Sequence, residues 1–479
     1  MSVEMSESAG VEASKPHVGT TIWEKIGYGF GDMSSSMFWK IFSYYLPFFY
    51  SNVFGLRLAD AGTLLLITKL YDAVSDPVMG MIADRTNTRW GKYRPYLLWM
   101  AIPFAIAGVL TFTTPDAGYA FKLSYAYFIY ILMMTAYTAI NVPYGAMLGV
   151  ITPSSSEKTV FSSFRMFFAY AGSFIALAIF EPLLKFFQKT FVADIRITEH
   201  SWEYTMMVVG IICAILFVLC FLMTRERVAV PASTAKRSSI SQDLKSLVGN
   251  GPWWILLSVA VGVLLFNSIR GGVAAYYFKD VIGAKAIYTC GVYLAVGEIA
   301  NMIGVALAVP VSLKIGKKNT YMAALAFSIV LSTLIGFVPM TKGGIWMLMA
   351  LQILVSASAG ITFPLLWSMF ADIADWSEDR TGSVTTGLIF SSSSMAQKFG
   401  GAFGSALILW ILAAYGYDTA EGASQSLAAV GGLKAMMSWI PAAGSVIALI
   451  AMWFYPLTEK KMSAVSASLA AKRAKSCPQ

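Results

Sequence analysis

Long apolar runs, separated by short polar connections, recur along the whole chain. A run of about 20 apolar residues can cross the hydrocarbon core of a bilayer as a helix, because its backbone groups pair within the segment. The sequence therefore predicts an all-α polytopic membrane protein embedded in the lipid bilayer. We count twelve transmembrane helices, at about 24–53, 59–84, 95–114, 122–151, 162–187, 203–224, 253–279, 286–313, 319–339, 345–376, 386–415 and 429–456.

The composition excludes several classes of function. Only 13% of the 479 residues are charged, against about 25% in soluble domains. The net charge of +9 is expected to reside in cytoplasmic loops, so we predict no nucleic-acid partner. The four cysteines and two histidines show no metal-ligand spacing, and the sequence contains no phosphate-binding loop and no catalytic triad. We therefore expect neither an enzyme nor a protein with a cofactor.

Basic residues predict the orientation of the chain. If the N-terminus lies inside, 21 lysines and arginines fall on the cytoplasmic side and 9 on the other side. An excess of this kind marks cytoplasmic loops, so both termini are predicted to be cytoplasmic. The first 22 residues are polar and lack the apolar stretch of a signal peptide, and they are expected to form a tail.

The longest predicted cytoplasmic connection falls after six apolar runs. We therefore expect a tail at 1–22, a six-helix half at 23–224, a central cytoplasmic loop at 225–252, a second six-helix half at 253–456 and a tail at 457–479. Two six-helix halves are the layout of the major facilitator fold.

Two carboxylates in the second run call for an explanation. Asp72 and Asp76 lie four residues apart, so they share one face of a helix. Placing a carboxylate inside a membrane span costs free energy, and such residues usually serve a function. This pair therefore predicts a site for Na⁺ or H⁺. Thr138 and Asn141 in the fourth run offer neutral oxygens, although they could simply link helices. The alternative for the acids is a structural ion pair with a basic residue in a span, namely Lys69, Arg165 or Lys398; both interpretations hold if the cation competes with a lysine.

The first run carries a polar stripe. Asp32, Ser36 and Lys40 are spaced by four residues and share a helix face. A sugar needs such polar groups for its hydroxyls, together with aromatic faces for its ring, so the stripe predicts a sugar site. The alternative is packing against another polar helix.

Other polar and aromatic residues in the runs are predicted to complete the sugar site: Tyr137, Arg165, Arg270, Trp367, Ser394 and Lys398. Cations inside a span are functional by default. Lys398 could instead extend to the membrane surface, but its place in mid-run disfavours that interpretation. Glu298 and Asn301 could face the same cavity.

Charges at the inner ends of the runs predict a gate. Asp372 and Asp375 lie at the inner end of the tenth run. Opposite them we expect the basic loop after the second run, whose first charged residues are Asp84, Arg85 and Arg89. Salt bridges between these groups would close the inner side of an alternating-access transporter. The alternative is a cluster of solvated loop charges.

Two motifs follow one another in and after the second run. Residues 72–80 read Asp-Ala-Val-Ser-Asp-Pro-Val-Met-Gly, and residues 84–95 read Asp-Arg-Thr-Asn-Thr-Arg-Trp-Gly-Lys-Tyr-Arg-Pro. Together they resemble the signature of the glycoside–pentoside–hexuronide:cation symporters. The likeness spans essentially the whole chain and includes 27–32, 141–144, 165–168, 371–376 and 398–401.

The resemblance implies a twelve-helix major facilitator protein of the bacterial inner membrane, in which Na⁺ or H⁺ drives the uptake of a sugar; we expect a monomer. The family's cation ligands fall on Asp72, Ser75, Asp76 and Thr138, and its basic residues of helices 5 and 11 fall on Arg165 and Lys398. The chain departs from melibiose permease at Asn141, Ser36 and Gly145, which argues against melibiose and leaves the ion open.

Two other functions stay open at this point. A transporter of the same fold could carry another amphipathic solute, such as a lysolipid, in a wide apolar cavity. A membrane sensor without transport is the third possibility, although the chain shows no appended signalling domain.

Overall fold

The computed structural model describes residues 20–152, 155–192, 194, 196–227, 249–283, 286–381, 386–420 and 423–476, and its elements over these residues are helices. The first group comprises α1 (Ile22–Phe48), η1 (Phe49–Val53), α2 (Leu58–Arg85), α3 (Pro95–Trp99), α4 (Ala101–Thr111), α5 (Tyr119–Ile151), α6 (Ser155–Thr190) and α7 (Ile197–Met223). The second comprises α9 (Gly251–Tyr277), η2 (Phe278–Ile282), α10 (Cys290–Ile315), α11 (Lys317–Ile335), α12 (Lys342–Thr381), α13 (Thr386–Ala414), α14 (Leu427–Met437), α15 (Trp439–Trp453) and α16 (Glu459–Ser476).

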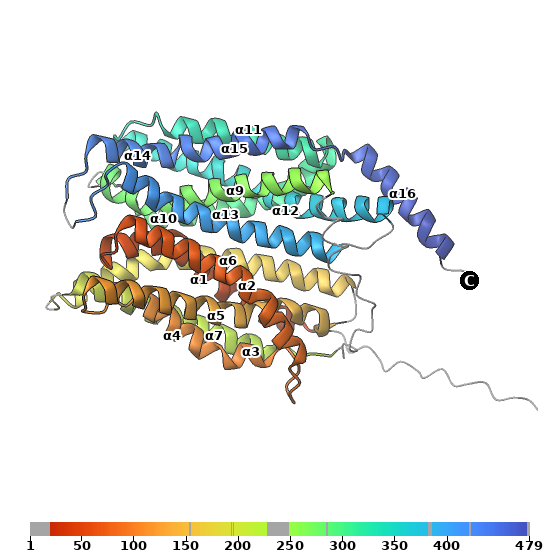
Figure 1. The fold of residues 1–479 in the computed structure, drawn as a ribbon, viewed down its shortest axis with the longest axis horizontal. Helices are drawn as coiled ribbons and strands as arrows, with labels where there is room; N and C mark the ends of the chain where they lie inside the picture. The colour runs from red at the N-terminus through yellow and green to blue at the C-terminus, as the bar shows by residue number, and fades with distance from the viewer. Residues whose placement is uncertain are drawn as a thin grey trace, which may run out of the picture.

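The two groups lie side by side, with α1–α7 forming one half and α9–α15 the other (Figure 1). We call them the N half and the C half. Helices α3 and α16 lie at one end of the bundle and α14 at the other, and we call these the α16 end and the α14 end (Figure 1). The predicted all-α, two-half membrane fold is confirmed.

Eight of the described helices are long and apolar enough to cross a membrane. Neither α1 nor α2 is among them, because both carry the polar residues of the predicted sites. In α2 the predicted site residues Asp72 and Asp76 are joined by Lys69 and, in the first turn, by Asp60. The count of twelve spans therefore stays a prediction, and polarity within α1 and α2 points to function rather than to lipid contact.

Several helices extend beyond the apolar runs. The sequence placed the start of the fifth run at 162 and the end of the tenth at 376, whereas α6 begins at Ser155 and α12 ends at Thr381. Charged residues end an apolar run without ending the helix, since backbone hydrogen bonds continue through them. The last run is divided at Ser438 into α14 and α15, and the predicted C-terminal tail contains α16.

Glycines allow helices to approach closely within each half. A Cβ on Gly172 of α6 would lie 2.4 Å from the Met33 carbonyl oxygen of α1. In the C half, a Cβ on Gly304 of α10 would lie 2.0 Å from the Ala357 carbonyl oxygen of α12. Both separations are too short for any larger residue, so these glycines set the positions of α1 and α10, which carry site residues.

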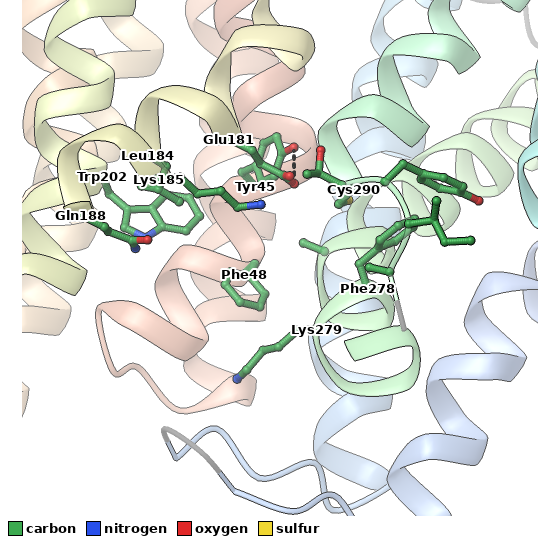
Figure 2. Close-up of a pocket in the computed structure, with 15 residues that line it drawn as sticks. Tyr45, Phe48, Glu181, Leu184, Lys185, Gln188, Trp202, Phe278, Lys279 and Cys290 are labelled. Carbon is green, nitrogen blue, oxygen red and sulfur yellow. Dashed lines mark hydrogen bonds between the residues drawn. The ribbon is translucent and has the colours of Figure 1, made fainter. Parts of the chain in front are cut away.

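At the α14 end, polar contacts join the two halves. The Glu181 carboxylate of α6 accepts hydrogen bonds from the Gly291 amide of α10 at 2.9 Å and from the Tyr45 hydroxyl at 3.2 Å. Beside them lies a cavity of about 380 Å³ between the halves, with Phe48 and Trp202 on one wall and Phe278 on the other (Figure 2).

More contacts close the same end. The hydroxyls of Ser51 and Tyr276 lie 2.7 Å apart, and Asn52 donates to the Tyr417 hydroxyl at 3.2 Å. Tyr417 in turn donates to Asp280 at 2.5 Å. The sequence analysis did not identify any of these contacts, because their partners are far apart along the chain.

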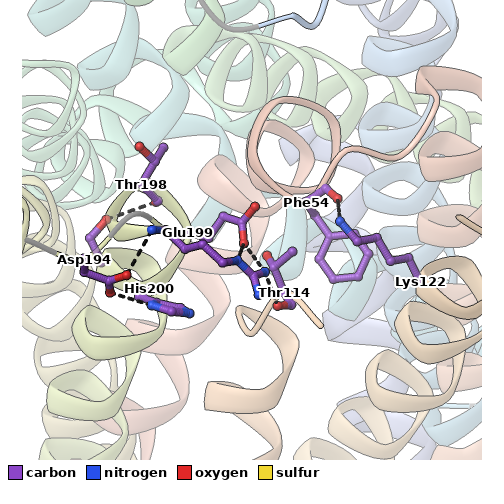
Figure 3. A network of polar contacts seen from close by, with 9 residues as sticks. Phe54, Thr114, Lys122, Asp194, Thr198, Glu199 and His200 are labelled. Atoms are coloured by element: carbon purple, nitrogen blue, oxygen red, sulfur yellow. Dashed lines mark hydrogen bonds and ion pairs between the residues drawn. The ribbon is translucent and has the colours of Figure 1, made fainter. Parts of the chain in front are cut away.

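A separate polar network fixes the α14 end of the N half (Figure 3). Arg196 donates to the Thr114 carbonyl at 2.9 Å and pairs with Glu199. His200 Nδ1 lies 2.6 Å from Asp194 Oδ2. The hydrogen bond from His200 lowers the pKa of Asp194. This network ties the start of α7 to the end of α4 and lies within one half.

Candidate functional site

The acids of α2 face α5. The Thr138 hydroxyl lies 2.8 Å from Asp72 Oδ1 and 3.1 Å from Asp76 Oδ1. The Ser75 hydroxyl lies 3.4 Å from the Thr138 hydroxyl and donates to the Asp72 carbonyl at 3.0 Å. Asp72 is only 2% exposed. The helical spacing of α2 thus brings four of the five predicted cation ligands together as a set of oxygen donors, the ligand type that hard cations prefer.

Lys398 of α13 joins this cluster from the C half. Its ammonium lies 2.9 Å from Asp72 Oδ2 and also pairs with Asp76. Lys398 was predicted as a sugar ligand, and an ion pair with it was the alternative to a cation site at the two acids. In the structure the lysine pairs with both acids, so the acids connect the two halves through it.

Two further residues flank the cluster. Asn141 donates its side-chain amide to the Tyr137 carbonyl of its own helix at 3.0 Å. Lys69, one turn before Asp72, is buried and places its ammonium 4.4 Å from the centre of the Trp39 ring. Sequence reasoning named Lys69 only as a partner for the acids, whereas its ammonium lies over an aromatic face in α1.

The polar stripe of α1 meets α6. Arg165 Nε donates to Asp32 Oδ2 at 2.9 Å, and the guanidinium lies 5.2 Å from the centre of the Tyr144 ring. Asp32 and Arg165 were predicted separately as sugar ligands, and the structure brings them together. A paired carboxylate and guanidinium present both acceptors and donors to a hydroxylated ligand.

Helices α1 and α5 also bring two aromatic rings together. Trp39 and Tyr137 lie 5.8 Å apart between ring centres, with their planes tilted by 32°. Ser36 is half-buried on the same helix as Trp39. The mixture of ring faces and polar groups that the sequence predicted for a sugar is therefore present between α1 and α5.

Lys40, the last residue of the stripe, turns to the C half. Its ammonium lies 2.6 Å from Glu298 Oε1 of α10. In the same region Arg270 Nη2 donates to the Tyr293 hydroxyl at 3.1 Å and to the Gln352 side chain. Glu298, which the sequence analysis mentioned only as a further candidate, is thus the partner of a predicted sugar ligand.

Two more predicted sugar ligands belong to the C half. Trp367 of α12 is half-buried, and its ring lies 6.3 Å from that of Phe370 in the same helix. The side chain of Ser394 lies outside the described residues, although its backbone belongs to α13.

On the N half, the loop after α2 is held by one carboxylate. Glu226 accepts backbone hydrogen bonds from Lys92, Tyr93 and Arg94 at 2.7–2.8 Å. Gly91 has a φ of +114°, and a Cβ there would lie 2.5 Å from the Glu226 carboxyl carbon, so the tight turn requires glycine.

Two of the predicted gate residues, Asp84 and Asp372, pair within their own halves. Tyr93 donates to Asp84 at 2.7 Å, and burial together with this carboxylate raises the pKa of Tyr93. Arg85 and Arg89 are exposed. On the C half, Asp372 binds Lys317 at 2.8 Å and Asp375 is half-buried. The structure thus does not bring the two predicted gate groups together, in contrast to the closed α14 end.

Comparison with known proteins places these features in a family. The family model described as MFS/sugar transport protein matches residues 27–459. The chain belongs to this family. It therefore belongs to the glycoside–pentoside–hexuronide:cation symporter group that its motifs resemble, and its relatives are transporters.

Three relatives from bacteria match nearly the whole chain. The inner membrane symporter YicJ of Escherichia coli is 33% identical, over 94% of this chain and 95% of the relative. The isoprimeverose transporter of Lactiplantibacillus pentosus is 31% identical, over 94% and 93%. The glucuronide carrier protein homolog of Escherichia coli is 28% identical, over 92% and 93%. This family membership supports a multi-pass protein of the inner membrane.

Solved structures share the fold. The nucleoside transporter NupG is similar with a TM-score of 0.59 and 14% identity, over 90% of this chain and 100% of that chain. A bacterial homologue of the lysosomal transporter Spinster, in an inward-facing unoccupied conformation, has a TM-score of 0.64 and 14% identity, over 94% and 99%. Both support the major facilitator fold.

Proposed function

We propose that this protein is a secondary active symporter that imports a sugar together with Na⁺ or H⁺ by alternating access. One observation carries the proposal: Lys398 of the C half is bound to Asp72 and Asp76 of the N half. A cation that binds the acids competes with this lysine and thereby changes the contact between the halves. Relatives named as an isoprimeverose transporter and a glucuronide carrier support a sugar as the transported solute.

The proposed sugar site lies between α1, α5 and α6. The pair of Asp32 and Arg165 supplies acceptors and donors, and Trp39 and Tyr137 supply ring faces. A lysolipid would need a wide apolar cavity instead. Charged and hydrogen-bonding groups at this position favour a hydroxylated solute over an acyl chain.

The proposed orientation places the α16 end in the cytoplasm, in agreement with the excess of basic residues there. In that orientation the contacts of Glu181 with Gly291 and of Ser51 with Tyr276 close the periplasmic side. The acids Asp84 and Asp372, at the cytoplasmic side, are paired within their own halves. We propose that this conformation faces the cytoplasm and that the predicted gate forms when the protein faces outward.

The coupling step follows from charge balance. With no cation bound, Lys398 neutralises part of the charge on Asp72 and Asp76. A bound cation takes over this role and frees the ammonium to bind the sugar. Separating the three charges without a cation would leave Asp72 buried and unpaired, which is strongly unfavourable.

Uptake into proteoliposomes tests the proposal. A panel of radiolabelled glycosides, pentosides and hexuronides is offered while the Na⁺ gradient and the pH gradient are varied independently. We expect at least one sugar to accumulate against its gradient in response to one of the two ions. Absence of both accumulation and counterflow for every sugar would refute the proposed function.

A further inference from the structure

A small polar cavity of about 40 Å³ lies inside the C half. Arg270 of α9, Glu298 of α10 and Gln352 of α12 line it, and Tyr44 of α1 covers it from the N half. Its walls depend on a glycine, since a Cβ on Gly297 would lie 2.5 Å from Gln352 Nε2. The cavity is therefore a built polar site among apolar helices.

Two buried atoms at this cavity have no hydrogen-bond partner among the described residues: Arg270 Nε and Glu298 Oε2. Arg270 is 7% exposed and Glu298 is 2% exposed. Another atom of each side chain is paired, because Glu298 Oε1 binds Lys40 and Arg270 Nη2 binds Tyr293. A buried donor or acceptor without a hydrogen-bond partner lowers the stability of the fold. Two such atoms at one cavity therefore indicate that a ligand binds there.

We propose that this cavity is a subsite that selects a neutral glycoside over a hexuronide. The inference rests on the proposed sugar transport and names the class of sugar. A hydroxyl group can accept a hydrogen bond, as Arg270 Nε requires, and can donate one, as Glu298 Oε2 requires, so hydroxyl groups suit both orphaned atoms. A carboxylate can only accept, so it could pair with Arg270 Nε but would leave Glu298 Oε2 without a donor.

The size of the cavity sets what enters it. A space of about 10–15 Å³ open to the centre of a water molecule is enough to hold one water, so the 40 Å³ of this cavity admits a hydroxyl or hydroxymethyl group. The ring stays between the halves, beside Tyr44 and Lys40, and only its edge enters.

A matched pair of ligands tests the charge preference. Methyl β-glucoside and methyl β-glucuronide differ only in a hydroxymethyl group against a carboxylate, and methyl β-galactoside with methyl β-galacturonide repeats the comparison. Binding to the purified full-length protein in lipid nanodiscs is measured by calorimetry. We expect the neutral sugar to bind about tenfold more tightly in at least one pair, as for the loss of one charged hydrogen bond.

Variants separate a subsite from a merely structural pocket. Glu298→Gln removes the negative charge and keeps an acceptor, so the ratio of neutral to uronide affinity should fall about tenfold. Glu181→Gln is the matched control, since Glu181 also joins the halves but lies outside the cavity, and the ratio should stay unchanged. If Glu298→Gln fails to fold, Glu298→Asp, which keeps a carboxylate but withdraws its unpaired oxygen by one methylene group, should lower the same ratio.

The outcomes are distinct. A wild-type protein that prefers the uronide in both pairs overturns the subsite and leaves sugar symport intact. An equal loss of both affinities in Glu298→Gln also overturns it, because a permanently bound water would behave in that way. A protein that neither binds nor transports any sugar overturns the proposed function itself.

Discussion

Among the described residues, two clusters of ion pairs connect the halves of the molecule, with opposite polarity. In the first, the N half supplies the acids Asp72 and Asp76 and the C half supplies Lys398. In the second, the N half supplies Lys40 and the C half supplies Glu298. The two clusters thus use the same chemical groups in reversed positions.

The clusters differ in how completely their groups are satisfied. Each acid of the first cluster contacts both the Thr138 hydroxyl and Lys398, so a cation can replace the lysine while charge balance is kept. In the second, Glu298 keeps one oxygen unpaired beside an unpaired Arg270 Nε among the described residues. A full set of oxygens around a removable charge suits an ion, whereas an orphaned donor and acceptor suit a neutral hydroxyl.

Removal of one acid from the first cluster is expected to have the largest effect. Asp72→Asn takes away the buried partner of Lys398, and loss of one member of a buried ion pair costs about 3–5 kcal/mol. We expect uphill sugar uptake in proteoliposomes to fall about 100-fold or more, while counterflow without an ion gradient persists.

Asp60→Asn is the matched control for that variant. Asp60 lies in the same helix but accepts a hydrogen bond from Tyr119 near the α14 end, away from Lys398. It should keep uphill uptake within about twofold. Equal losses in the two variants would mean that Asp72 stabilises α2 rather than coupling an ion.

Breaking the second cluster should affect stability more than coupling. Lys40→Met leaves Glu298 buried without its cation, and we expect unfolding free energy to fall by about 2 kcal/mol, since Lys40 is partly exposed. Lys40→Met combined with Glu298→Met should recover most of this loss, because a neutral apolar pair replaces a buried ion pair at little cost. Thermal unfolding in detergent measures both. A double variant that is less stable than the single one contradicts the pairing.

The site of the first cluster could be predicted because it follows helical spacing. Asp72, Ser75 and Asp76 lie on one face of α2, and the motif places Thr138 opposite them. The predicted all-α architecture also follows from apolar runs, which report burial in lipid directly.

The second cluster could not be predicted in the same way. Periodicity tells which face of α1 carries Lys40, but it does not tell which helix that face meets, and Glu298 lies 258 residues away. The same reason hides the contact of Glu181 with Gly291. The gate expected between Asp84 and Asp372 depends on the conformation, and each acid pairs locally here.

A smaller effect should distinguish the ion in the first cluster. Lys398→Met removes the competing ammonium from Asp72 and Asp76, so Na⁺ would bind the acids without displacing a lysine. At tenfold above its dissociation constant, a bound ion stabilises the folded state by about 1.4 kcal/mol. We expect Na⁺ to raise the Tm of this variant more than that of the wild type. A rise on lowering the pH, without any response to Na⁺, would instead identify H⁺ as the coupling ion, and no response to either contradicts a cation site.

The smallest effect is expected outside both clusters, at Asp194 and His200, which lie within one half. The hydrogen bond from His200 holds the pKa of Asp194 below its ordinary value of about 4. The charged carboxylate therefore stabilises the fold above pH 4, and this contribution is lost as the pH falls through the lowered pKa. Asp194→Asn should lower the Tm slightly at pH 6 and less at pH 3, with sugar uptake unchanged at neutral pH. A fall in uptake as large as that expected for Asp72→Asn would contradict this prediction. Polar contacts within one half would then affect transport as much as the ion pairs between the halves.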